Sequence, residues 1–182
     1  MRDQLRIAIF TIVETVALAT WLALVNGAAN TGSTVAGLAV LAVGFTIEHI
    51  LAYNVVHGRG LLDLRGVPIA QKAVVSVIET GIWALWLILA DRNAIVAAIV
   101  LAGLLIVEHT LSDNVFKGKG LFSRLIDTRT IGFSLIEAVG AAIWLALVVA
   151  NLAIVGIIVL LVASFVEHSM AVALGRRETV RT

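Results

Sequence analysis

Apolar positions along this chain form six long runs, separated by short stretches that are polar or rich in glycine. The runs are apolar on every face, unlike the alternating pattern of a half-buried strand, and each has the roughly 20 residues that cross a bilayer. Because backbone polar groups in lipid must be satisfied within their own segment, we expect six transmembrane helices. They are predicted near residues 7–26, 34–56, 70–90, 94–116, 131–150 and 152–174.

An internal repeat groups these helices into three hairpins. In each copy the first helix carries a lone glutamate, which a tryptophan follows seven residues later. The second helix carries an adjacent Glu-His pair about 30 residues after that glutamate. The chain is therefore predicted to be one transmembrane domain, 1–182, with repeats at about 7–56, 70–116 and 131–174.

Basic residues predict how the hairpins are oriented. Twelve of the thirteen lysines and arginines lie on one side of the predicted spans. They stand before the first helix, in the two longer loops, at the start of the third helix, or after the sixth helix. Only Arg92 lies on the other side. The positive-inside rule then places both termini in the cytoplasm, and all three hairpins run in the same sense. The predicted fold is an all-α bundle of three parallel hairpin repeats with pseudo-three-fold symmetry, multi-pass in the cell (plasma or inner) membrane.

Composition supports the membrane class and narrows the chemistry. Hydrophobic residues make up 60% of the chain and charged residues 14%, whereas a soluble domain is nearer half apolar and a quarter charged. The net charge of +1 gives no indication of nucleic acid as a partner, and the absence of cysteine excludes thiolate metal sites. The apolar run that begins near Arg6 has no cleavage signal after it, so we interpret it as a retained first span.

Nine ionisable residues inside the predicted spans form the candidate site. At 1.5 Å per residue, each lone glutamate and each Glu-His pair lies roughly 12 Å from the basic end of its helix, so all nine fall in one layer in the cytoplasmic half. Ionisable groups at such depth are costly and indicate function by default. The candidate residues are Glu14, Glu79 and Glu137, the pair members Glu48, Glu108 and Glu167, and the histidines His49, His109 and His168.

Transition-metal binding is the leading hypothesis for this layer. Imidazole and carboxylate suit zinc, iron, copper or manganese, and three histidines from three helices could together ligate one ion. The glutamates would be further ligands, or acceptors that fix the imidazole tautomer. The sequence does not decide whether the metal is transported, stored or used for chemistry. It therefore leaves open whether the protein is an enzyme, and it identifies no catalytic residue.

Two other hypotheses use the same residues. Intramembrane Glu and His chains relay protons or cations in transporters and channels, although the outer half offers few polar groups for a continuous path. Alternatively, each lone glutamate bonds the histidine of its own hairpin and only holds the helices together, as in a structural membrane subunit. The expected partners are the lipid bilayer and a metal ion or proton; a homo-oligomer or a larger membrane complex also stays open.

Overall fold

Six long apolar helices make up the fold in the computed structural model, which describes residues 2–27 and 30–179. Every one of them is long and apolar enough to cross a membrane. Their bounds differ from the predicted ones by at most five residues, the largest differences being at the N-terminus of the first helix and the C-terminus of the sixth. The helices are α1 (Arg2–Gly27), α2 (Thr31–Val56), α3 (Ile69–Ala90), α4 (Ala94–Phe116), α5 (Ile131–Val149) and α6 (Ala153–Thr179).

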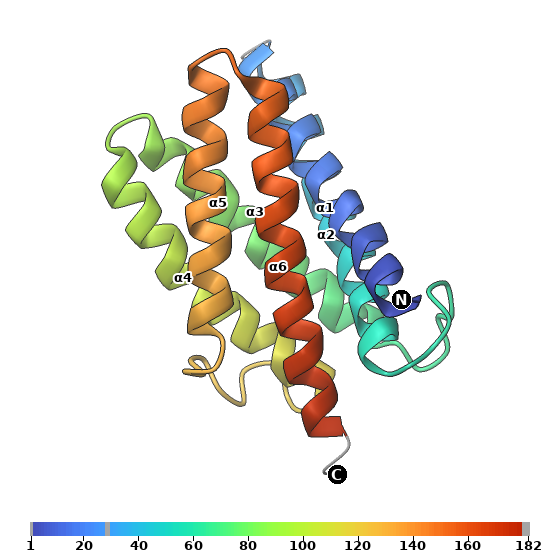
Figure 1. Cartoon of the computed structure of the whole chain (residues 1–182). Coiled ribbons are helices and arrows are strands. Elements are labelled where there is room, and N and C mark those ends of the chain that lie inside the picture. Colours follow the sequence, from blue (N-terminus) through green and yellow to red (C-terminus); the bar gives the residue numbers. More distant parts are fainter. Residues whose placement is uncertain (1, 28–29, 180–182) are drawn as a thin grey trace.

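Neighbouring helices pack as a closed ring. The helices pack in the pairs α1–α2, α3–α4 and α5–α6, and α2 also packs on α3, α4 on α5, and α6 on α1. The start of α1, the end of α6 and the two longer connections lie toward one end of the bundle, which we call the terminus end (Figure 1). The turns between α3 and α4 and between α5 and α6 lie at the other end, which we call the turn end.

The two longer connections, α2–α3 and α4–α5, both begin with a glycine that caps the preceding helix. Gly58 and Gly118 follow the last residues of α2 and α4 and have positive φ angles, which glycine adopts without the strain of a Cβ. The side-chain amides of Asn54 and Asn114 then donate to the carbonyls of Leu61 and Leu121, at 2.8 and 2.9 Å. These asparagines therefore anchor the loops, which explains why they recur in two hairpins only.

A tryptophan-rich core fills the half of the bundle nearer the turn end. Trp21, Trp83, Trp86 and Trp144 are all buried there among leucines, and the Trp86 and Trp144 rings stack with centroids 6.5 Å apart. Small residues on the facing helices make room for the indoles: a Cβ on Gly156 would lie 3.0 Å from Cδ1 of Trp144. Apolar side chains therefore fill the space between the helices in this half, as far as the structure describes it.

Candidate metal centre

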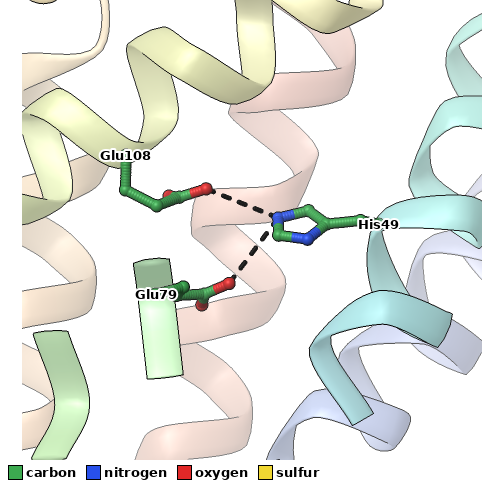
Figure 2. Close-up of side chains that lie close together, drawn as sticks. All are labelled: His49, Glu79 and Glu108. Carbon is green, nitrogen blue, oxygen red and sulfur yellow. Dashed lines mark ion pairs between the residues drawn. The ribbon is translucent and has the colours of Figure 1, made fainter. Parts of the chain in front are cut away.

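His49 on α2 lies at the meeting point of three carboxylates. Its Nε2 is 3.5 Å from Glu48 Oε2 on its own helix, 3.6 Å from Glu79 Oε2 on α3, and 3.4 Å from Glu108 Oε1 on α4. Figure 2 shows Glu79 and Glu108 pointing toward the imidazole from two helices of the next hairpin. Ligand atoms of His49, Glu79 and Glu108 all lie within 4.8 Å of one another, the one such group among the described residues.

The same set of contacts recurs at the other two histidines. His109 Nε2 lies 3.2 to 3.6 Å from one carboxylate oxygen each of Glu108, Glu137 and Glu167. His168 Nε2 lies 3.2 to 3.5 Å from oxygens of Glu14, Glu48 and Glu167. All nine candidate residues are thus connected in one cluster, the Glu/His cluster.

The glutamates of the cluster divide into two kinds. Glu48, Glu108 and Glu167 each present one oxygen to the histidine that follows them in sequence and the other oxygen to a second histidine. We call these three the bridging glutamates. The lone glutamates of the first helices each contact a single histidine, and we call them the terminal glutamates: Glu14, Glu79 and Glu137.

A hydroxyl group positions each imidazole from the other side. Nδ1 of His49 lies 2.9 Å from Ser76 Oγ, whose own proton is donated to the Lys72 carbonyl at 2.9 Å. Since that hydroxyl proton is already used, the oxygen accepts from Nδ1–H, and in the neutral ring Nε2 keeps a lone pair directed at the carboxylates. This is the arrangement by which metal-ligating histidines are usually oriented.

The other two histidines have equivalent hydroxyl partners. Ser134 lies 2.7 Å from His109 Nδ1, and Thr11 lies 2.9 Å from His168 Nδ1. Each hydroxyl donates to a carbonyl four residues earlier on its own helix. Thr11, Ser76 and Ser134 all stand three residues before a terminal glutamate, so the repeat contained a signal for them that the sequence interpretation missed.

Several carboxylate oxygens of the cluster have no hydrogen-bond donor. Oε2 of Glu14, Glu79 and Glu137 and Oε1 of Glu108 are buried and accept no hydrogen bond within the part of the chain that the structure describes, although each lies 3.2 to 3.6 Å from a histidine Nε2. Buried polar atoms are normally satisfied, and leaving one unpaired costs about 1–3 kcal/mol, more when it is charged. These oxygens therefore need a proton or a cation beside them.

A cavity of about 50 Å³ adjoins the Glu/His cluster on its terminus-end side. Small side chains on α2, α4 and α6, namely Ala52, Ser112 and Ala171, line it three residues beyond each histidine. No tryptophan lies among its lining residues in the described chain. The cavity therefore adjoins the cluster from the terminus end, while the tryptophan-rich core closes the turn end.

The interpretation of the lone glutamates as partners within their own hairpin is wrong in its pairing. Glu79 contacts His49, Glu137 contacts His109, and Glu14 contacts His168, so each bond joins two neighbouring hairpins. The reason is that depth fixes the layer but not the direction in which a helix presents a side chain.

Two charged residues near the cavity break the repeat. Lys72 was predicted to flank the start of the third helix, but it is buried, with Nζ 3.5 Å from the centroid of the Phe116 ring. Asp113 lines the cavity and forms an ion pair with Lys117. The corresponding positions after the other two histidines are Tyr53 and Val172, so this acidic side chain belongs to the second hairpin only.

A loop carboxylate shows how this chain balances negative charge with its own cations. Arg129 bonds Asp127 and holds the pKa of that carboxyl well below its usual range, with Arg124 adding to the effect. In the Glu/His cluster the cationic candidates within ion-pair distance are the histidines. Even three imidazoliums would leave three of six carboxylate charges uncompensated.

Comparisons with protein-family profiles, with curated proteins and with solved structures found no match for this chain. What the fold and the site define is a multi-pass, all-helical membrane protein with a buried His/Glu cluster that could bind metal.

Proposed function

We propose that the protein holds transition-metal ions as a resident centre within the cell membrane, bound by the Glu/His cluster. The observation that carries the proposal is the hydroxyl behind each imidazole, which leaves Nε2 free to bind a cation among three carboxylate oxygens. Zinc, iron, manganese and copper all accept this mixture of donors.

The proposal also places the metal centre within the bundle and within the membrane. Three parallel hairpins would surround a pseudo-three-fold axis, with both termini in the cytoplasm and the cluster in the cytoplasmic half of the membrane. The recurrence of the histidine contacts supports the symmetry, and the basic loops at the terminus end support the orientation.

Storage or chemistry fits the site better than transport across the membrane. A transported ion would have to pass the tryptophan-rich core, in which Trp86 and Trp144 stack among buried leucines. The cavity that the described residues form lies on the terminus-end side of the cluster, so ions would enter and leave from the terminus end.

Elemental analysis of the purified full-length chain tests the proposal. We expect bound zinc, iron, manganese or copper, and we expect His109→Ala to lower the metal content. His57→Ala is the matched control, because His57 stands outside the cluster, stacked on Tyr53 at the end of α2. A protein that stays metal-free after incubation with each of the four metals would refute the proposal.

The same protein in liposomes separates a resident centre from a cation pathway. We expect no metal or proton flux above that of empty liposomes. Flux that Glu79→Gln abolishes would contradict the resident centre and favour a transporter or channel.

A further inference from the structure

We infer that the Glu/His cluster binds three divalent ions, one at each histidine, joined in a triangle by the three bridging glutamates. This inference rests on the proposed function and adds to it a stoichiometry, a ligand assignment and a class of metal. It replaces the expectation that three histidines converge on one ion.

Each histidine Nε2 faces a set of three carboxylate oxygens, and at His49 the ligand atoms of His49, Glu79 and Glu108 also lie within 4.8 Å of one another, the one such group among the described residues. At His49 the set is Nε2 with one oxygen each from Glu48, Glu79 and Glu108, at 3.4 to 3.6 Å from the nitrogen. Four donors at tetrahedral positions around an ion, with bonds of about 2.0–2.1 Å, lie about 3.3 Å apart. Direct N–H···O hydrogen bonds are shorter, at about 2.7–3.2 Å, so most of these spacings fit donors around a common ion better than donors bonded to each other.

The bridging glutamates link these sets pairwise. Glu108 presents Oε1 to His49 and Oε2 to His109, at 3.4 and 3.6 Å. Glu167 joins His109 to His168 in the same way, and Glu48 joins His168 to His49. A carboxylate that gives one oxygen to each of two ions holds those ions a few ångströms apart, as in two-metal sites, where the separation is about 3.5–4 Å.

Charge balance is also consistent with three ions. Each set contains one terminal glutamate and half shares in two bridging glutamates, which is two negative charges for one divalent cation. Three such cations neutralise all six carboxylates, whereas a single one would leave four negative charges on buried side chains. The carboxylate oxygens without hydrogen-bond donors belong to these sets, namely Oε2 of Glu14, Glu79 and Glu137 and Oε1 of Glu108.

The donors define the class of metal. One imidazole nitrogen and three carboxylate oxygens suit zinc(II), manganese(II) and iron(II), and the absence of cysteine disfavours copper(I), which prefers thiolate and thioether sulfur. Calcium and magnesium are less suitable, because both prefer sites built from oxygen alone.

Metal counting on the detergent-solubilised full chain tests the inference, with zinc(II) alone and manganese(II) alone as probes. After equilibrium dialysis we expect three ions per chain. Glu108→Gln alters two sets of donors and Glu79→Gln alters one, so we expect the bridging variant to lose more metal than the terminal variant. The His57→Ala control should keep all three ions.

Electron paramagnetic resonance of the manganese-loaded protein gives a second readout that needs no variant. Three ions that share carboxylates are exchange-coupled, and we expect a spectrum unlike the hyperfine pattern of an isolated manganese ion. If the variants fail to fold, this spectrum and the wild-type count still decide the question.

The outcomes for the inference and for the proposed function are distinct. One or two ions per chain at saturation, or magnetically isolated manganese, would overturn the triangle and leave a metal centre standing. A chain that binds none of the metals offered would overturn both.

Discussion

The two halves of the bundle bury opposite kinds of side chain between their helices, apolar in one half and ionisable in the other. Toward the turn end, indoles and leucines fill the space between the helices, and small residues such as Gly156 accept the rings. Toward the terminus end, the same helices bury the carboxylates and imidazoles of the Glu/His cluster beside a cavity. Among the described residues, the apolar half leaves the neutral indole nitrogens of Trp83 and Trp86 without a hydrogen-bond partner, whereas the polar half leaves carboxylate oxygens without a donor.

This difference indicates a division of roles along each helix. On α5, Glu137 and Trp144 are two turns apart, and both are buried. A buried indole that excludes water would strengthen electrostatic attraction at the glutamate two turns away. We therefore expect the polar half to depend on bound cations and the apolar half to be independent of them.

Removal of metal should have the largest effect. A bound ion contributes about 2.7 kcal/mol at a free concentration of 100 times its Kd, so loss of the ions from the cluster should lower Tm by more than ~10 °C. A strong chelator added to the purified protein, followed by thermal unfolding in detergent, measures this. Hydrogen exchange should increase more around His49 and His109 than around Trp86.

Restoring zinc is the control for that experiment. Zinc(II) should recover Tm, and the same concentration of magnesium(II) should not, because the cluster offers imidazole nitrogen as well as oxygen. An unchanged Tm after verified removal of the metal would show that protons, not ions, balance the carboxylates.

Truncating a core tryptophan should have the next largest effect. Trp86→Ala leaves a cavity where a fully buried indole stood and should reduce the free energy of unfolding by about 3–5 kcal/mol. The number of ions bound per folded chain should stay at the wild-type value, since Trp86 packs in the tryptophan-rich core among buried leucines.

Trp86→Phe is the matched variant, with a smaller loss of stability and the same metal content. If either variant loses metal while it remains folded, the two halves are coupled and the comparison fails.

The six helices were largely predictable because the hydrophobicity of the runs determines them. Uniformly apolar runs of about 20 residues allow only helices in lipid, and the structure has them at the expected positions. The sixth helix is the clearest difference: it was expected to end near residue 174, but α6 continues to Thr179, with Gly175 packed against Val56. The symmetry and the orientation stay predictions.

The membership of the cluster was predictable and its connectivity was not. The spacing of Glu14, Glu48 and His49 from basic helix ends gave their depth, since rise per residue is fixed. Which partner each one meets depends on how every helix is rotated about its axis, and successive residues point about 100° apart. Glu48 and His49 therefore contact different neighbours, and that information lies in the packing of all six helices.

The smallest expected effect concerns access to the cluster, and cysteine substitution measures it in a chain that has no native cysteine. Ala171→Cys and Leu160→Cys lie three turns apart on the same helix, α6, the first beside the cavity and the second in the tryptophan-rich core. A membrane-impermeant thiol reagent should modify the Ala171→Cys protein at least about tenfold faster, since reactivity follows exposure of the thiolate.

Membrane sidedness and metal occupancy sharpen this last comparison. In sealed vesicles the reagent should act only from the side that carries the termini, and zinc(II) should slow it at Ala171→Cys by occupying the cluster next to the cavity. Equal labelling of the two variants would mean that the core opens to water, and modification of Leu160→Cys from the turn end would reveal a path through the tryptophans. Either result would contradict the resident centre and favour a transmembrane pathway. The tryptophan-rich core would then not separate the cluster from the turn end.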